Sequence, residues 1–571
     1  MKNAQIARIF RDIAKLLELK GENPFRIRAY ERAALNIDSL AEDLEVFLNR
    51  GRLTEIPGIG KDLALKVEEI IKTGTLSFYE KLKKDIPESL LLMMEIPGLG
   101  PKTVKYIYDK LHIDTIEKLD SAARKGRLRT IEGIREKTEE NIIKGIALIR
   151  QGKERTPLYF ALQIAGQFIN SLKKIKEVEI IEPAGSLRRR KDTVKDIDIL
   201  VISKKPKRVM ECFTGLPQVK EVIAHGETKS SVVAKERNIQ VDVRVVNKDS
   251  FGAALMYFTG SKQFNIKMRQ LAVKRGYKIN EYGVFSHKDK KIAGRTEEEI
   301  FSLMRMEYIP PQLREDRGEI EAALKKKLPH LLELKDIKGD LHIHSLYSDG
   351  DSSIEEIAEA ALKRGYEYVA ITDHSQSLKV AGGLEKKAVY KKIEEIKKIN
   401  KKYRNFHILC GSEVDILSEG NLDYSDGILK EFDLVIASIH SGFKQSKRQL
   451  TKRIISACKN KYVHIIGHPT GRLWGARDAY DVDLEEIFKV AKDYHVALEI
   501  NCYPQRMDLN DANALWAKRR GVKLSLGTDA HILKQLDTME LGLNVARRGW
   551  LEKKDILNCL SIESLRKWLR K

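Results

Sequence analysis

From residue 339 to the C-terminus, short apolar runs alternate with amphipathic helical patterns, and no other feature constrains the fold of this 571-residue chain so strongly. Such alternation predicts a parallel β/α barrel or a layered sheet. In that class of protein, the chemistry lies at the C-terminal ends of the strands. The expected strands are residues 341–344, 368–372, 407–410, 434–439, 463–466, 496–500 and 522–526, and expected helices include residues 354–365 and 391–401.

Histidines and carboxylates follow these expected strands. Nine of the 13 histidines lie between residues 342 and 531. One buried histidine is usually a structural core residue, but so many histidines and carboxylates at strand ends are typical of a multinuclear metal site. Such a cluster lowers the pKa of bound water and holds both oxygens of a phosphodiester. The candidate ligands are His342, His344, Asp349, His374, Glu413, His440, His468, Asp529 and His531.

A second group of carboxylates lies further forward, in a stretch that reads as α+β or α/β. Asp196 and Asp198 are separated by one isoleucine, so on a strand both carboxylates point to the same side. Asp242, flanked by valines, is able to join them from a neighbouring strand. Three carboxylates and incoming phosphates form a site for two Mg²⁺; the simpler alternative is an acidic turn. A small loop, a hydroxyl and a positive charge suited to the β- and γ-phosphates come from Gly185, Ser186 and Arg189.

The front of the chain reads as helical and contains two similar turns, at residues 55–61 and 95–102, with a degraded third copy at 131–137. In each turn, glycines let backbone N–H groups approach a DNA phosphate before a helix whose dipole favours the anion. A single copy is more often an ordinary helix-turn-helix loop, whereas two copies with a nearby lysine favour DNA binding by shape. The candidate DNA-binding residues are Gly58, Gly60, Gly98, Gly100 and Lys102.

Composition supports a nucleic-acid partner. The chain has 104 Lys+Arg against 82 Asp+Glu, a net charge of +22. Residues 1–340 hold 66 Lys+Arg and 50 Asp+Glu, and the excess of 16 suits a polyanion because phosphate contacts release counterions; a solvated basic surface is the alternative. Five scattered cysteines without a C-x-x-C pair predict free thiols, and no apolar run predicts a signal peptide or membrane span. We therefore expect a cytoplasmic protein without a membrane partner.

Residues 1 to about 318 resemble the family X DNA polymerases, and polymerase beta in particular. The shared motifs are Gly-Ser-x-Arg-Arg, the two-strand aspartate triad, residues 226–229, residues 257–261 and residues 280–282. The resemblance implies an α+β nucleotidyltransferase palm and a thumb, with Mg²⁺ or Mn²⁺ on Asp196, Asp198 and Asp242. It also implies nucleotide contacts by Tyr257, Phe258, Gly260 and Asn265 and a DNA contact by Arg269.

The chain departs from polymerase beta at two places near these motifs. Gln240 stands where that protein has an arginine before the third carboxylate, and Lys262 stands where it has an acid beside the nucleotide. The resemblance also aligns Lys66 with the lysine that forms a Schiff base with an abasic deoxyribose phosphate. Such an amine needs burial or cationic neighbours to lower its pKa, and a helix-surface lysine is the alternative interpretation.

Residues 339–571 resemble the polymerase-and-histidinol-phosphatase (PHP) domain that follows family X polymerases in bacteria and archaea. The resemblance implies a (β/α)-barrel-like fold and up to three Mn²⁺ or Zn²⁺ ions. The first ion would be held by His342, His344, Glu413 and Asp529, the second by Glu413, His440 and His468, and the third by Asp349, His374 and His531. It further implies 3′–5′ exonuclease and abasic-site (AP) endonuclease or 3′-phosphodiesterase activity. His407, His464 and His495 match no ligand position and are expected to be structural or surface residues.

The sequence thus predicts a multidomain chain with an all-α, helix-hairpin-helix front. We expect a monomeric DNA repair enzyme. Its expected substrates are gapped, nicked or abasic-site DNA and deoxynucleoside triphosphates, in base excision repair. The alternatives are a template-independent nucleotidyl transferase and a DNA-binding scaffold with an inactive PHP domain. The predicted segments are a lyase-like domain at 1–90, a second helix-hairpin-helix subdomain at 91–150, the palm at 151–246, the thumb at 247–318, a linker at 319–338 and the PHP domain at 339–571.

Overall fold

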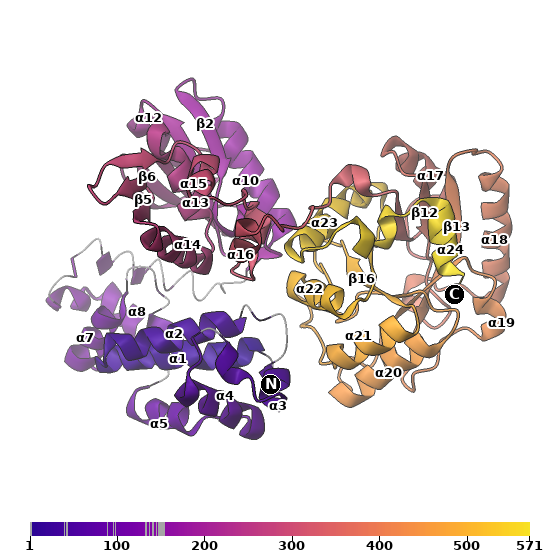
Figure 1. Cartoon of the computed structure of the whole chain (residues 1–571), viewed down its shortest axis with the longest axis horizontal. Coiled ribbons are helices and arrows are strands. Elements are labelled where there is room, and N and C mark those ends of the chain that lie inside the picture. The colour runs from indigo at the N-terminus through magenta and orange to yellow at the C-terminus, as the bar shows by residue number, and fades with distance from the viewer. Residues whose placement is uncertain are drawn as a thin grey trace. The chain divides into compact units, whose positions relative to one another are not determined.

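The computed structural model of the chain consists of two compact units, residues 1–155 and 156–571 (Figure 1). The residues that it describes are 3–38, 40, 44–56, 58–87, 89–94, 96, 99–131, 134, 135, 138, 139, 142, 143, 146 and 155–570. None of the helices among these residues is long and apolar enough to cross a membrane.

The described residues of the first unit form helices and the turns between them, as predicted. Its longest helix has an apolar stripe in which Ile6, Phe10, Ile13 and Leu17 are fully buried, which is the helical period expected of an amphipathic helix. The two glycine turns come directly before helices α4 and α7. The described helices are α1 (Asn3–Lys20), α2 (Pro24–Asp38), α3 (Leu44–Asn49), α4 (Lys61–Thr73), α5 (Ser77–Asp85), α6 (Ser89–Met93), α7 (Pro101–Leu111) and α8 (Ile116–Arg124).

The second unit begins with a five-stranded sheet in the order β2-β4-β7-β6-β5, in which only the β4–β7 pair is parallel. Helices α10 and α12 cover one face, where Phe168 and Phe213 meet edge to face. The elements are α10 (Leu158–Leu172), β2 (Val178–Pro183), α11 (Gly185–Arg188), β4 (Asp196–Ser203), α12 (Pro206–Thr214), β5 (Val219–His225), β6 (Lys229–Ala234) and β7 (Gln240–Val246), with the short antiparallel pair β1 (Thr156–Pro157) and β3 (Thr193–Val194).

A smaller helical layer with a three-stranded antiparallel sheet follows and has its own apolar core. Ile320 and Ala323, in the segment predicted as a linker, are buried in this core. The elements are α13 (Phe251–Thr259), α14 (Lys262–Lys274), β8 (Tyr277–Asn280), β9 (Gly283–Ser286), β10 (Lys291–Ala293), α15 (Glu297–Leu303) and α16 (Glu319–Leu324).

The last part is a nearly closed barrel of seven parallel strands that pair in sequence order, so the predicted barrel-like fold is confirmed. A bridge between Ile343 and Ala530 joins the first and last strands. At that seam, the Asn558 amide donates to the carbonyls of Gly339 and Leu526, both at 2.8 Å, and so replaces missing strand hydrogen bonds. The strands are β11 (Gly339–Ile343), β12 (Tyr368–Ile371), β13 (His407–Asp415), β14 (Leu434–Ser438), β15 (Ile465–Ile466), β16 (Ala497–Asn501) and β17 (Leu524–Gly527).

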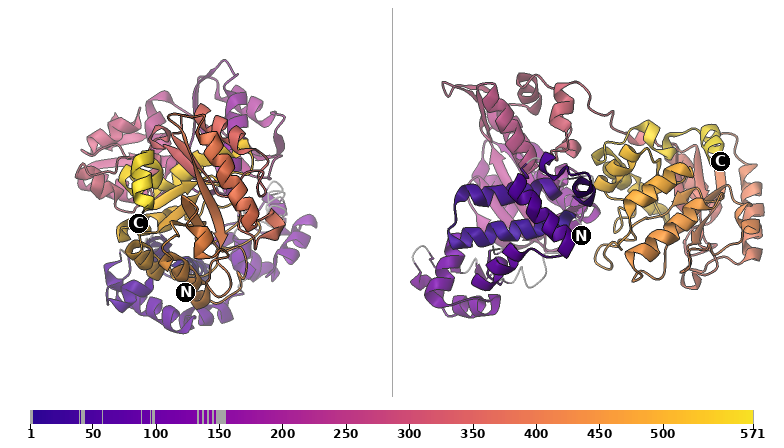
Figure 2. Two further views of the ribbon diagram at one scale, coloured as in Figure 1. Left: turned by 90° about the vertical axis from the view of Figure 1, so that its right-hand side faces the viewer. Right: turned by 60° about the horizontal axis from the view of Figure 1, so that its bottom comes forward.

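Helices surround the barrel strands, as Figure 1 shows for α17, α18, α20, α21 and α22, and the two further views of Figure 2 show the same layering. The end of the barrel at which the strands begin is filled by apolar side chains, among them Leu341, Leu409 and Ile436, which pack with α24. The helices are α17 (Ile354–Lys363), α18 (Lys386–Asn400), α19 (Asp426–Leu429), α20 (Lys447–Lys459), α21 (Leu484–Asp493), α22 (Asp511–Arg520), α23 (Met539–Arg548) and α24 (Ile562–Leu569).

Candidate active sites

The parallel pairing of β4 and β7 brings two of the predicted carboxylates side by side. The register sets Asp198 opposite Asp242 and Asp196 opposite Gln240, while the intervening apolar residues are buried. Burial, and next the negative charges of Asp196 and Asp242, raise the pKa of Asp198 to about 7. A carboxylate cluster of this kind gains most from bound cations, because cations remove the mutual repulsion.

The neighbours of the aspartates hold them in place. The Gln240 side-chain amide donates to Asp242 Oδ1 at 2.9 Å, so this departure from polymerase beta still orients the third carboxylate. Lys229 Nζ lies 4.0 Å from Asp242 Oδ2. Gly185 has a φ of +62°, and a Cβ there would lie 2.4 Å from an Asp198 carboxylate oxygen. Only glycine therefore permits this approach of the loop to the carboxylate.

The Gly-Ser-x-Arg-Arg segment forms the short helix α11 and connects the sheet to the following helical layer. Arg188 donates to both carboxylate oxygens of Glu297, at 2.9 and 2.8 Å. Arg189 Nε donates to Glu315 Oε1 at 2.9 Å, and its Nη1 donates to the Thr259 carbonyl. Sequence reasoning missed Glu297 and Glu315, since both lie more than 100 residues away from their partners.

The aromatic pair predicted by resemblance lies at the end of α13. The Tyr257 and Phe258 rings meet edge to face with centroids 5.2 Å apart, and the Arg244 guanidinium lies 4.4 Å from the centre of the Phe258 ring. The Asn265 amide donates to the Tyr257 carbonyl at 2.6 Å. Arg269 Nε donates to the Asn265 carbonyl at 3.3 Å. These residues thus form one connected group beside Gly260.

In the first unit, Gly60 and Gly100 are the N-caps of α4 and α7, and Gly58 has a φ of +83°. Gly98 lies outside the described residues, and the Lys102 side chain is likewise not described. Lys66 lies on α4, hydrogen-bonded to Asp62 and 5.8 Å from the centre of the Phe78 ring. Its side chain is 16% exposed, so Lys66 is more enclosed than an ordinary helix-surface lysine.

All nine predicted PHP ligands lie around the open end of the barrel, at the C-terminal ends of its strands or in the loops that follow. Glu413 is the central residue. Its Oε1 lies 2.9 Å from His468 Nε2 and 3.3 Å from His440 Nε2. Its Oε2 lies 3.3 Å from His342 Nε2 and 3.1 Å from His374 Nδ1. Although burial raises the pKa of Glu413, the surrounding histidines hold it well below its usual value.

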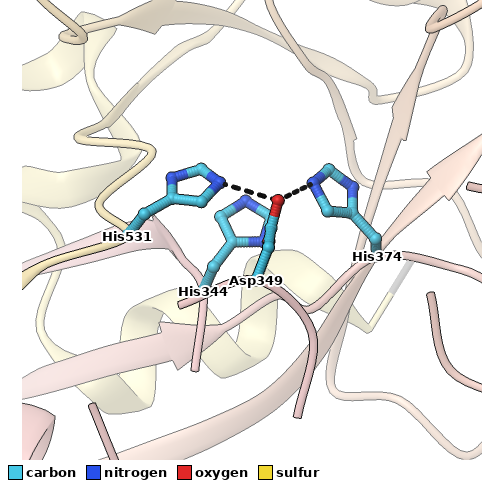
Figure 3. A group of neighbouring side chains, drawn as sticks. All are labelled: His344, Asp349, His374 and His531. Atoms are coloured by element: carbon cyan, nitrogen blue, oxygen red, sulfur yellow. Dashed lines mark ion pairs between the residues drawn. The ribbon is translucent and has the colours of Figure 1, made fainter. Parts of the chain in front are cut away.

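Three overlapping groups of side chains have ligand atoms within 4.8 Å of one another. In one of them, Asp349 Oδ2 lies 3.4 Å from His531 Nε2 and 3.7 Å from His374 Nε2, beside His344 (Figure 3). The groups are His344, Asp349, His374 and His531; His342, His344, Glu413 and Asp529; and His374, Glu413 and His440. These differ in detail from the sets implied by resemblance: His344 and His374 each belong to two groups, and His468 belongs to none of the three, although it lies 2.9 Å from Glu413.

The donor atoms of this cluster fit metal ions. His342 Nε2 and His344 Nε2 are buried, and neither atom has a hydrogen-bond partner among the described residues. Nevertheless, Glu413 Oε2 lies 3.3 Å from His342 Nε2, and Asp529 Oδ1 lies 3.0 Å from His344 Nε2. Histidine nitrogens that lie beside carboxylate oxygens without a hydrogen bond between them have the arrangement of ligands around a metal ion.

Further carboxylates orient the ligands from behind. His342 Nδ1 lies 2.7 Å from Glu499 Oε1, and His440 Nδ1 lies 2.5 Å from Asp415 Oδ1. Such contacts fix the tautomer and the ring orientation of a metal-binding histidine. Sequence reasoning missed both acids, although Asp415 carries a detectable signal: it lies two residues after Glu413 and therefore on the same face of β13. His464, in contrast, bonds to the backbone of Val435 and is structural.

This fold and these sites define a class of protein in which a polymerase palm and thumb are followed by a PHP metallohydrolase barrel. Residues 254–315 match the family described as DNA polymerase beta thumb, and residues 340–502 match the PHP domain. Residues 1–76 match a helix-hairpin-helix domain, and residues 90–147 match a SAM-like helix-hairpin-helix tandem.

The chain is 40% identical, over all of both chains, to the DNA polymerase/3′-5′ exonuclease PolX of Bacillus subtilis strain 168. It therefore belongs to the family X DNA polymerases that carry a PHP domain. A probable phosphatase of Thermoanaerobacter sp. strain X514 is 34% identical over 230 residues, which is 38% of this chain and 89% of that protein. A probable phosphatase of Caldanaerobacter subterraneus is 31% identical over 40% of this chain and 90% of its own length.

Proposed function

We propose that the chain is a DNA-directed DNA polymerase that fills short gaps during base excision repair and trims 3′ ends with its PHP barrel. The observation that carries this proposal is the presence of two separate phosphate-directed sites on one chain, the aspartates of β4 and β7 and the histidine-carboxylate cluster of the barrel. The Bacillus subtilis relative has both activities in its name.

In the palm, Asp196, Asp198 and Asp242 would hold two Mg²⁺ or Mn²⁺. When bound, such ions activate the attacking 3′-hydroxyl and stabilise the leaving oxygen of an in-line displacement. The backbone of Gly185 and Ser186 would bind the triphosphate, and Tyr257 and Phe258 would contact the sugar. Gln240 keeps Asp242 in its orientation through its 2.9 Å hydrogen bond.

In the barrel, the nine ligands would hold up to three Mn²⁺ or Zn²⁺. Ions in such a site supply a hydroxide at neutral pH and clamp the scissile phosphate. Glu499 and Asp415 hold the His342 and His440 rings in their ligand orientation. The same chemistry would serve AP endonuclease and 3′-phosphodiesterase reactions, because each is the hydrolysis of a phosphate ester.

The test is a set of reactions on gapped and abasic-site DNA, with and without nucleotides, across Mg²⁺, Mn²⁺ and Zn²⁺. We expect templated gap filling with nucleotides and 3′ trimming without them. Equal extension with and without a template strand would favour a template-independent nucleotidyl transferase. Absence of turnover in either reaction, with metal bound, would favour an inactive scaffold and refute the proposal.

We further propose that Lys66 is the nucleophile of a 5′-deoxyribose-phosphate lyase. The enclosure of its side chain, which is 16% exposed and lies beside the Phe78 ring, supports this role. Borohydride should trap a covalent complex between the protein and an incised abasic-site DNA. The Lys66→Arg variant should lose the trapped complex, whereas Lys72→Arg, which alters an exposed lysine on the same helix, should retain it. Equal trapping by both variants would refute the role.

A further inference from the structure

One arginine of the barrel reaches the nucleotide-binding segment of the palm. Arg548 lies at the end of α23, and its side chain is only 1% exposed. Its Nη1 donates to the Arg189 carbonyl at 2.8 Å and to Glu315 Oε1 at 3.0 Å. Its Nη2 donates to Asp511 Oδ2 at 2.7 Å. A single guanidinium thus joins α22, the end of the thumb and the residue that follows α11.

Arg548 belongs to a buried group of charges, the Arg548 cluster, which consists of Arg189, Glu315, Arg317, Asp511 and Arg548. Arg189 Nε donates to Glu315 Oε1 at 2.9 Å, and Arg317 Nη1 donates to Asp511 Oδ2 at 3.1 Å. Each of the two carboxylates therefore accepts from Arg548 and from one other arginine. Burial raises the pKa of Glu315, but Arg189 and Arg548 hold it well below its usual value. Arg317 and Arg548 do the same for Asp511. Both carboxylates are therefore charged at neutral pH.

The geometry of this cluster requires arginine at position 548. Three acceptors in different directions match the fork of a planar guanidinium, whereas the compact ammonium of lysine serves fewer of them at once. The position at the C-terminus of α23 also favours a cation, because the carbonyl end of a helix is negative. The residue that follows Arg189 is Arg190, and its φ is +56°. A positive φ is unusual for a residue with a side chain.

We propose that Arg548 is a positioning residue for nucleotide addition, through which the barrel holds the Gly185–Arg189 segment in its triphosphate-binding arrangement. This inference rests on the proposed polymerase function. Arg548 acts on the nucleotide only through Arg189, whose carbonyl and whose partner Glu315 it holds at the same time. Fixing both the backbone and the side-chain partner of Arg189 restricts its guanidinium to one position beside Thr259.

The experiment uses the full chain with Arg548→Met, which fills the same volume and leaves each acid one arginine partner. Steady-state gap filling should give a KM for the nucleotide that is raised about tenfold, the size of coupling found within charged networks. The metal content of the barrel and its exonuclease rate should stay within about twofold. The matched control is Arg364→Met, which removes a partly exposed arginine that pairs with Asp537 within the barrel and should leave the nucleotide KM unchanged.

Arg548→Lys separates geometry from charge. The Arg548→Lys variant should show most of the increase in nucleotide KM that Arg548→Met shows, because one ammonium does not replace the three contacts of the guanidinium. A wild-type KM in Arg548→Lys would overturn the positioning role. An unchanged KM in Arg548→Met, or equal losses of polymerase and exonuclease activity, would also overturn it. If Arg548→Met does not fold, Asp511→Asn weakens the anchor and should raise KM in the same direction. Failure of the wild-type protein to extend a primer would instead refute the proposed function.

Discussion

Replacement of Glu297 by glutamine is the sharpest test of how the palm is joined to the thumb. Glu297 is 4% exposed and accepts from two arginines. Arg188 belongs to the nucleotide-binding segment, and the Arg314 side chain is fully buried. The Tyr308 hydroxyl also donates to Glu297, at 3.0 Å. Glutamine keeps the volume but removes the charge, so two largely buried guanidinium groups lose their counter-ion.

The pKa of Glu297 gives the magnitude. Burial raises this pKa, but Arg314 and Arg188 lower it from 4.5 to about 2. A difference of about 2.5 between unfolded and folded states corresponds to about 3 kcal/mol at neutral pH. Removal of one partner of a buried ion pair costs about 3–5 kcal/mol, which agrees. Because the folded-state pKa is depressed, this stabilisation is complete above pH 4.5 and is lost as the pH falls toward 2.

The assay is urea unfolding followed by tryptophan fluorescence. All four tryptophans lie after residue 156, so the signal reports on the second unit alone. Glu297→Gln should lower the free energy of unfolding by about 3 kcal/mol at pH 7, and the difference should shrink below about pH 4.5. Glu298→Gln is the control, because it makes the same change at an exposed neighbouring position. Equal effects of the two substitutions, or a difference that does not depend on pH, would refute the reasoning.

Three further predictions concern the two sites. Asp242→Ala should abolish primer extension and leave exonuclease activity, whereas Asp529→Ala should do the reverse; loss of both activities in one variant contradicts two separate sites. Asp415→Asn, which removes the partner of His440, should lower metal affinity or exonuclease activity about 10- to 100-fold, as measured by metal analysis and 3′ trimming, with extension unchanged. Gln240→Ala should lower the rate of extension about tenfold without loss of folding, because Asp242 loses its orienting hydrogen bond; an unchanged rate in single-turnover kinetics would show that this bond is dispensable.

The parts of the molecule that follow local periodicity could be predicted from the sequence. Alternation on a strand placed Asp196 and Asp198 on one side, and the register of β4 with β7 does set Asp198 beside Asp242. The alternating pattern after residue 339 predicted the parallel strands, and the strand ends do bring Glu413 together with its histidines. The sequence did not distinguish a barrel from a layered sheet, because closure depends on a contact between Ile343 and Ala530 that has no local signal.

The residues that sequence reasoning missed act over long separations. Glu499 lies 157 residues from His342, and Arg548 lies 359 residues from Arg189. Each looks like an ordinary charged residue in its own segment, and its role depends on which elements the fold brings together. The segment boundaries stay a prediction, although Ile320 shows that part of the expected linker is buried in the core of the preceding layer.

The two sites differ in how they balance charge, and this difference bears on how each would hold its metals. The palm gathers three carboxylates, and the raised pKa of Asp198 reflects burial together with their mutual repulsion. In the barrel, histidines surround Glu413 and Asp529 and lower the pKa of both, even though burial acts in the opposite direction. A preformed set of histidine nitrogens and carboxylates suits ions that stay bound between reactions. A purely acidic site suits ions that arrive with the triphosphate, whose oxygens complete their coordination. The palm would therefore exchange its cations with each nucleotide, while the barrel would retain its own.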